Sequence, residues 1–138
     1  MRTLVLDTNV ILRYLLRDHE GMYQSAIKLF DQAEQGEFTL HIDPMVIAEC
    51  IYVLTGSLYQ RNRSDVSQTL AEILLLDGVT CENQDLLTES LTLFSERNVD
   101  FTDAYLACRS RAMGAGVASF DRDFLKLGVQ VHVPESRT

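Results

Sequence analysis

The sequence has no tryptophan, two prolines, seven glycines and three cysteines among its 138 residues. So little proline and glycine leaves no flexible linker between domains. The apolar runs fall short of the roughly 18 residues that a membrane-spanning helix needs, and the apolar core before Asp7 is too short for a secretion signal. We therefore expect a single domain over residues 1–134, a tail over residues 135–138, and a cytoplasmic protein without a membrane span.

Cysteine and histidine are too few and too scattered for a zinc site or a disulfide framework. Cys50, Cys81 and Cys108 are odd in number and form no C-x-x-C pair, and the three histidines lack ligand spacing. The cysteines are expected to be free thiols in a reducing compartment.

Positive charge is also scarce, since 12 basic residues stand against 20 acidic ones and give a net charge of −8. This balance excludes a protein that coats nucleic acid through bulk positive charge. A metal-dependent nuclease stays possible, because its metal-binding carboxylates would themselves add negative charge. Most basic residues are arginines, which suit phosphate contacts. Five of them lie in segments that could face a site or could be solvated surface: Arg13, Arg17, Arg61, Arg63 and Arg122.

Short β-type runs alternate with helical segments, which is typical of an α/β fold with a mainly parallel sheet. The expected strands are residues 4–6, 38–42, 79–81, 117–119 and 129–133. The expected helices are residues 9–17, 22–35, 45–55, 84–97, one from Ser64 or Asp65 to Leu76, and one from Thr102 or Asp103 to Gly114. Because Leu4–Leu6 is continuously apolar, it is expected to be a central strand covered on both faces.

Two carboxylates follow strands of this predicted sheet. Asp7 ends the first apolar run, and Asp121 closely follows residues 117–119. Both should lie at the carboxyl edge, where open α/β sheets bind ligands. Each could instead be a helix N-cap.

Two further carboxylates stand on helices. Glu49 is the only residue of 45–54 that is not hydrophobic, and a helix that is apolar all round is expected to be buried. A buried carboxylate needs a cation or good donors, so Glu49 is either a metal or reaction residue or the partner of an arginine. Asp103 stands at a helix start, where it could cap the helix or bind a metal in ionised form.

Carboxylates that converge on one edge repel one another unless a divalent cation lies among them. Oxygen ligands without histidine or cysteine favour Mg²⁺ or Mn²⁺. The chemistry that suits such a site is phosphodiester hydrolysis by a metal-activated water. Asp7, Glu49, Asp103 and Asp121 are thus the candidate catalytic residues.

The segments around these acids resemble the motifs of PIN domains. They are Asp7-Thr8-Asn9-Val10-Ile11-Leu12, Glu49 in its apolar helix, Phe101-Thr102-Asp103-Ala104, and Ser119-Phe120-Asp121-Arg122-Asp123-Phe124. Each motif alone is weak, but four in order across one small α/β chain form a strong signal. The chain looks most like the VapC-type toxins, which are the ribonuclease halves of VapBC toxin–antitoxin pairs.

The resemblance implies a PIN-like α/β fold with a central, mostly parallel, five-stranded sheet flanked by helices. It implies Mg²⁺- or Mn²⁺-dependent cleavage of RNA, with Asp7 and Asp103 as the most direct metal ligands and Glu49 and Asp121 completing the site. Supporting roles fall to Thr8 or Asn9, which could orient Asp7, to Ser119 as a hydrogen-bonding residue, and to Asp123, which is either a further acid or a solvated helix start. The resemblance also implies a homodimer and a cognate antitoxin whose segment lies in an apolar groove with an arginine near the acids.

Alternative functions are weighed against this one. A PIN-fold module that binds RNA or protein without catalysis would keep the fold and lack the activity. A phosphatase of the haloacid dehalogenase type needs a second acid two residues after the first, where this chain has Asn9. A receiver-like domain needs paired early acids and a late lysine, and the chain has only Lys28 and Lys126.

Overall fold

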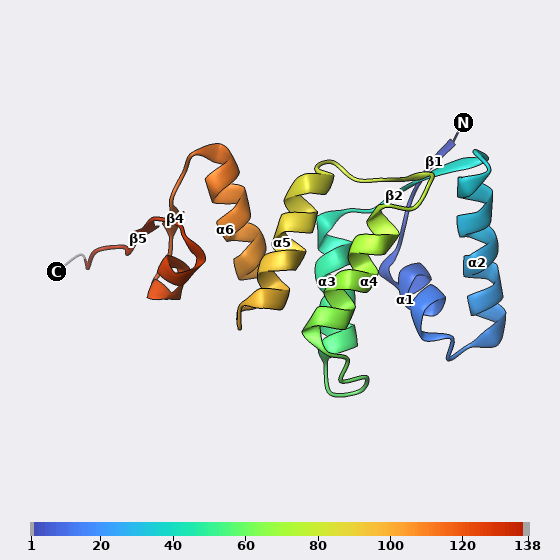
Figure 1. Cartoon of the computed structure of the whole chain (residues 1–138), viewed down its shortest axis with the longest axis horizontal. Coiled ribbons are helices and arrows are strands. Elements are labelled where there is room, and N and C mark those ends of the chain that lie inside the picture. The colour runs from blue at the N-terminus through green and yellow to red at the C-terminus, as the bar shows by residue number, and fades with distance from the viewer. Residues whose placement is uncertain (1, 137–138) are drawn as a thin grey trace. The chain divides into compact units, whose positions relative to one another are not determined.

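A computed structural model describes residues 2–136, and the chain divides into two compact units (Figure 1). Unit 1 is Met1–Gln84 and unit 2 is Asp85–Thr138. Of the tail expected over residues 135–138, residues 137 and 138 lie outside the described residues, and residues 135 and 136 have no regular secondary structure. Among the described residues no helix is both long and apolar enough to cross a membrane.

Unit 1 is a parallel sheet with helices packed beside it. Its elements are β1 (Arg2–Val5), α1 (Thr8–Leu16), α2 (Glu20–Glu34), β2 (Phe38–His41), α3 (Pro44–Thr55), α4 (Arg63–Leu74) and β3 (Val79–Thr80). β2 lies between β1 and β3, with Val5 opposite His41 and Leu40 opposite Val79. α1 packs against α2 and α3, and α4 packs against α3. Fully buried aliphatic side chains fill the interior between these elements: Ile11, Leu40, Ile42, Ile47 and Leu70.

Local side-chain chemistry sets the helix starts of unit 1. The Asp43 carboxylate accepts a hydrogen bond from the Met45 N–H at 2.9 Å, and Pro44 occupies the first turn, so α3 begins as its sequence predicts. α4 begins at Arg63 behind the cap Asn62, which corrects the expected caps Ser64 and Asp65.

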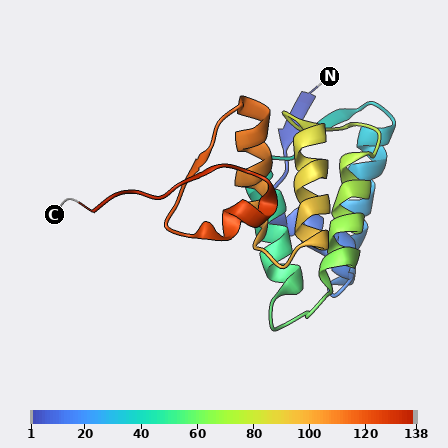
Figure 2. The ribbon, with the colours of Figure 1, turned by 60° about the vertical axis from the view of Figure 1, so that its left-hand side comes forward.

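Unit 2 combines two helices with a small parallel sheet. Its elements are α5 (Gln84–Glu96, whose first residue belongs to unit 1), α6 (Phe101–Met113), β4 (Val117–Ala118), the 3₁₀ helix η1 (Arg122–Leu127) and β5 (Val131–His132). α5 and α6 lie side by side in both ribbon views (Figure 2). α6, η1 and the segment after η1 share a small core of Ala107, Phe124, Leu127 and Val129.

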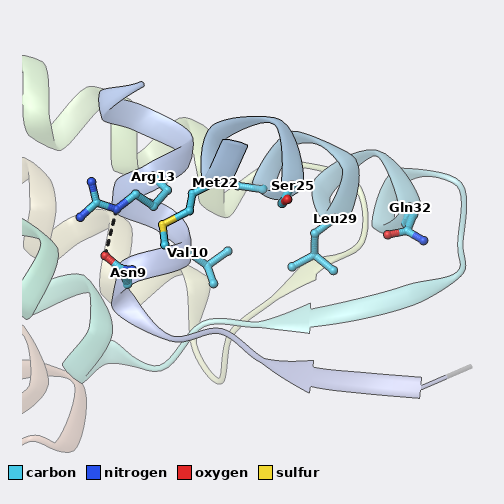
Figure 3. Close-up of a pocket in the computed structure, with 8 residues that line it drawn as sticks. Asn9, Val10, Arg13, Met22, Ser25, Leu29 and Gln32 are labelled. Carbon is cyan, nitrogen blue, oxygen red and sulfur yellow. Dashed lines mark hydrogen bonds between the residues drawn. The ribbon is translucent and has the colours of Figure 1, made fainter. Parts of the chain in front are cut away.

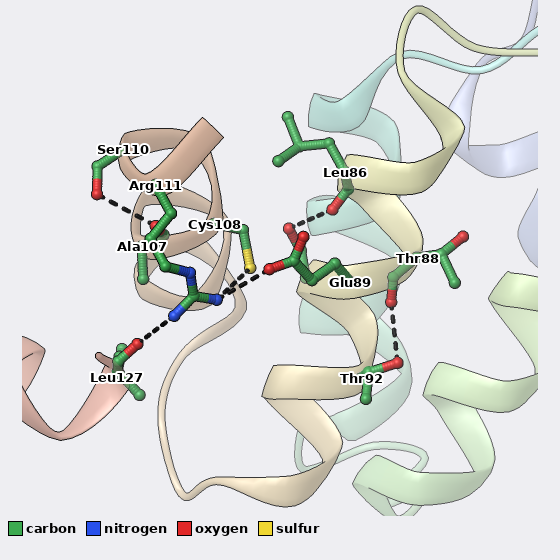
Figure 4. A network of polar contacts seen from close by, with 10 residues as sticks. Leu86, Thr88, Glu89, Thr92, Ala107, Cys108, Ser110, Arg111 and Leu127 are labelled. Atoms are coloured by element: carbon green, nitrogen blue, oxygen red, sulfur yellow. Dashed lines mark hydrogen bonds and ion pairs between the residues drawn. The ribbon is translucent and has the colours of Figure 1, made fainter. Parts of the chain in front are cut away.

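Arg111 joins three elements of unit 2 (Figure 4). One guanidinium nitrogen donates to the Leu127 carbonyl at 2.6 Å, and the other lies 2.9 Å from the Glu89 carboxylate and 3.6 Å from Cys108 Sγ. The contacts connect α6 to α5 and to the end of η1. At the turn that follows η1, Gly128 has φ +76°, and a Cβ there would lie 3.2 Å from the guanidinium. The turn therefore favours glycine for both its backbone and its close approach to Arg111.

The α/β class is confirmed, and strands form at the five expected places, all paired in parallel. The expected single sheet of five strands is not seen within residues 2–136, where β1-β2-β3 and β4-β5 form separate sheets. β1 is an edge strand of its sheet, and Val5 is 71% exposed. The expectation of a central strand covered on both faces was therefore wrong, because β1 has a pairing partner on one side only.

Candidate active site

Asp7 stands directly after the buried Leu6, at the carboxyl edge of the sheet of unit 1. It occupies the N-cap position of α1 with φ −82° and ψ 148°, but its side chain makes no capping hydrogen bond. Asp43 has the matching place after the neighbouring strand β2, with φ −84° and ψ 145°, and its side chain does cap. The N-cap alternative therefore explains Asp43 and leaves the exposed Asp7 carboxylate without a capping role.

The two residues after Asp7 differ in their surroundings. Thr8 is buried at 6% exposure, whereas Asn9 is exposed and its Oδ1 accepts a hydrogen bond from Arg13 Nε at 3.2 Å. Asn9 is thus oriented by the next turn of its own helix.

Glu49 lies in the middle of α3, and its side chain is exposed. Met45 and Tyr52, one turn away on either side, are 80% and 81% exposed, so α3 has an open face along this stripe. The expectation that this helix is buried all round was wrong. Its other face is buried through Ile47, Cys50, Ile51 and Leu54, and an apolar composition alone does not tell which face lies inside.

An apolar groove begins beside Asn9 and runs between α1 and α2 (Figure 3). Its volume is about 400 Å³. Asn9 and Arg13 lie at one end, and Val10, Met22 and Leu29 line the part that follows. The Asn9 end of the groove is two residues along the chain from Asp7.

Unit 2 brings Asp103 and Asp121 close enough to influence each other. Asp103 lies in the first turn of α6, and its side chain is half-buried. Burial, followed by the negative charges of Asp100 and Asp121, raises the pKa of Asp103 above its usual value. A cation would relieve this repulsion and favour the ionised carboxylate.

Asp100 is a member of this cluster that sequence reasoning missed. It is the N-cap residue of α6 and, like Asp7, makes no side-chain capping hydrogen bond. The corrected helix start at Phe101, in place of Thr102 or Asp103, reveals its position. The sequence did contain a signal for Asp100. It directly precedes the helix whose first turn carries Asp103.

Three hydrogen bonds donated by backbone N–H groups hold the loop that carries Asp121. The Ser119 N–H donates to the His132 carbonyl at 3.0 Å, and the Asp121 N–H donates to Ser119 Oγ at 2.9 Å. Asp121 Oδ1 in turn accepts from the Asp123 N–H at 2.8 Å. The Asp123 carboxylate lies 3.5 Å from Lys126 Nζ in an exposed ion pair, which fits a solvated helix start.

The candidate arginines have different surroundings. Arg13 pairs with Asp18, and Arg17 pairs with Glu20 and lies over the Tyr23 ring at 4.4 Å. These contacts hold both arginines against their own segment of unit 1. The other three lie elsewhere: Arg61 is exposed before α4, Arg63 is the first residue of α4, and Arg122 is exposed beside Asp121.

Neither unit alone, within residues 2–136, groups three histidine, cysteine or acidic side chains around one metal position. The cysteines are free thiols, and the candidate donors Asp7, Glu49, Asp103 and Asp121 are all carboxylates. An all-oxygen donor set suits a hard divalent cation.

Comparison with known proteins defines the class to which this fold and these acids belong. The model of the PIN domain matches residues 4–130, so the chain belongs to the PIN domain family, as its motifs predict.

Within that class, the chain is similar to a VapC ribonuclease of Aquifex aeolicus (strain VF5). The two are 29% identical over 131 residues, which cover 94% of this chain and 96% of the relative.

Proposed function

We propose that the protein is a Mg²⁺- or Mn²⁺-dependent ribonuclease that hydrolyses RNA phosphodiester bonds as the toxin of a toxin–antitoxin pair. The observation that carries the proposal is the Asp7 carboxylate, which follows β1 and the buried Leu6 without capping its helix. The family membership and the similarity to a VapC ribonuclease support it. We also propose that the protein is cytoplasmic, which its three free thiols suit, and that residues 1–134 act as one nuclease domain.

The residues present suit a hard divalent cation. The candidate ligands Asp7, Glu49, Asp103 and Asp121 offer only oxygen donors. Burial, followed by the nearby carboxylates of unit 2, raises the pKa of Asp103. When bound, such an ion supplies Lewis-acid activation of the phosphate and of the attacking water. The proposal assigns Asp7 and Asp103 as the most direct ligands, with Glu49 and Asp121 completing the site.

The chain's own residues prepare these carboxylates. Asp103 lies in the first turn of α6, where the helix dipole opposes the rise in its pKa that burial and the neighbouring carboxylates cause. Ser119 fixes the backbone at Asp121, and one Asp121 oxygen is already used by the Asp123 N–H. Its second oxygen is the one that can turn to a ligand. The non-catalytic module stays the alternative function, and it lacks a specific observation in its favour.

The decisive experiment is degradation of structured RNA in Mg²⁺ or Mn²⁺, by wild type and by Asp7→Asn and Asp103→Asn. Wild type should cut, chelation should stop it, and both variants should lose at least about a hundredfold in rate. Asp43→Asn is the matched control, because it removes a carboxylate from the equivalent strand end while asparagine still caps the helix. The proposal fails if wild type is inactive, or if Asp7→Asn cuts as fast as Asp43→Asn.

Metal binding can be measured without RNA. Adding Mn²⁺ should raise the melting temperature of wild type, because a ligand that binds the folded state stabilises it. In metal-free buffer Asp103→Asn should melt higher than wild type, because it removes a half-buried charge and its repulsion from Asp100 and Asp121, which together raise the pKa of Asp103. Added Mn²⁺ should then shift this variant much less. Equal shifts in both proteins would contradict the assignment of Asp103.

The antitoxin is proposed to occupy the α1–α2 groove with an apolar segment and to direct an arginine toward the Asp7 carboxylate. The apolar lining and the position of the groove beside Asn9 support this occupant. The homodimer is proposed from the family resemblance, and light scattering of the purified protein tests it. A small reading frame upstream of the gene would supply the partner for binding experiments.

A further inference from the structure

Phe120 differs from the other five phenylalanines of the chain. It is 80% exposed, and Phe38 is half-buried beneath the Arg2 guanidinium at 5.0 Å. The remaining four are at most 6% exposed: Phe30, Phe94, Phe101 and Phe124. Within residues 2–136, none of the close ring–ring or cation–π contacts involves Phe120. A single exposed apolar side chain is common on protein surfaces, so exposure alone does not give Phe120 a function, and its location has to be considered.

The backbone on both sides of Phe120 is fixed. Ser119 is bonded to the His132 carbonyl, the Asp121 N–H is bonded to Ser119 Oγ, and Asp121 Oδ1 holds the next turn. The ring therefore stands on a hydrogen-bonded loop rather than on a free surface segment. A phenylalanine in such a loop can bind a ligand with little further loss of conformational freedom.

The loop also places the ring directly beside a proposed catalytic carboxylate. Asp121 follows Phe120 in the chain, and Asp100, Asp103 and Asp123 add negative charge in the same unit. Apart from a bound cation and the exposed Arg122, these surroundings offer little attraction for a phosphate. The flat face of a nucleobase is uncharged, and stacking on an aromatic ring needs no positive charge.

We propose that Phe120 is a positioning residue, which stacks on an unpaired base next to the phosphate that is cut. This rests on the proposed ribonuclease function. It gives a chain of net charge −8 a way to hold RNA that does not depend on counterion release. Only single-stranded RNA can offer such a base, because a base within a duplex is already stacked.

The first test compares cleavage of a short single-stranded RNA by wild type, Phe120→Leu and Phe120→Trp in Mn²⁺. Loss of one stacked base should raise KM roughly tenfold in Phe120→Leu and leave kcat within about twofold. Phe120→Trp keeps an aromatic face and should restore KM. Leu125→Ala is the control, because Leu125 is 56% exposed on η1 and should leave KM unchanged. All variants should melt within a few degrees of wild type.

The second test uses salt. The ratio of the KM values of Phe120→Leu and wild type should stay constant as the salt concentration rises, because stacking releases no counterions. Arg122→Ala, which removes an exposed charge two residues away, should instead reduce the salt slope by about 1 if it contacts a phosphate. A Phe120→Leu variant that changes the salt slope, or that lowers kcat while KM is unchanged, overturns the proposal.

Failure of this inference can be distinguished from failure of the proposed function. If wild type cuts RNA and Phe120→Leu cuts with the same KM, the ribonuclease stands and the stacking role falls. If wild type does not cut, the role of Phe120 is tested by binding. The affinities of wild type and Phe120→Leu are compared for the same labelled RNA, once single-stranded and once annealed to its complement. Weaker binding of only the single strand by Phe120→Leu supports stacking. Equal binding by both proteins overturns it. The proposal also fails if Phe120→Leu loses binding of the proposed antitoxin while its KM and its affinity for RNA stay unchanged.

Discussion

Replacing Arg111 by alanine removes the contacts that tie α6 to α5 and to the end of η1. The charged guanidinium of Arg111 donates to the part-buried Leu127 carbonyl at 2.6 Å. A hydrogen bond from a charged group contributes about 1.5–3 kcal/mol. The ion pair with Glu89 is screened, because the two side chains are 38% and 54% exposed, and it contributes at most about 1 kcal/mol. Arg111→Ala should therefore lower the free energy of unfolding of unit 2 by about 1.5–4 kcal/mol.

The assay is urea unfolding followed by far-UV circular dichroism, together with a thermal melt. For a chain of this size the loss corresponds to a fall in melting temperature of roughly 5–14 °C. Glu89→Gln keeps the bond to Leu127 and should lose no more than about 1 kcal/mol. Equal losses in the two variants would show that the ion pair, rather than the carbonyl bond, holds unit 2. A loss below about 0.5 kcal/mol in Arg111→Ala would refute the reasoning altogether.

Three further predictions concern unit 1. The hydrogen bond from Arg13 lowers the pKa of Asp18 below its usual 3.8, so the ionised form stabilises the fold above that value and the benefit is lost as pH falls through the lowered pKa. Asp18→Asn should therefore be less stable than wild type at pH 7, and its melting curve should converge with that of wild type in strong acid; a constant difference would contradict this. Burial raises the pKa of Cys50 to about 12, so iodoacetamide should label this thiol only after unfolding, and mass spectrometry of the folded protein should find it unmodified. Met22→Glu places a charge in the groove and should weaken binding of the antitoxin at least about tenfold, whereas Gln24→Glu, also on α2 but outside the groove lining, should leave it unchanged in calorimetry.

Local chemistry made much of the fold predictable. The Asp43-Pro44 pair determines a helix start almost by itself, and the structure begins α3 there. The start of α4 was misplaced because Asn62, Ser64 and Asp65 are all favourable N-cap residues. The left-handed Gln60, two residues before Asn62, leaves no clear mark in the sequence. Strand pairing was the least predictable feature, because a parallel neighbour is chosen by contacts far along the chain.

The candidate site likewise contains residues that the sequence could place and residues that it could not. Asp7 and Asp121 could be placed at strand ends, because an acid directly after an apolar strand is a local pattern. The surroundings of Glu49 could not, because the exposure of a helix face depends on what packs against it. Asp100 was missed with the helix boundary, and Phe120 was missed because exposure separates it from the other phenylalanines and composition does not.

The comparison of Asp7 with Asp43 indicates how an inactive but stable variant could be made. The two residues follow neighbouring strands in the same register and share one backbone conformation, yet only Asp43 is needed to start its helix. Asp7→Asn should consequently disarm the protein at no expense in stability, since asparagine tolerates the same backbone and could even add the missing cap. Under the proposed toxin function, such a variant could be produced without harm to the host cell. It would keep the groove and the Phe120 loop intact, and it could therefore be used to trap an uncut RNA or an antitoxin for structure determination.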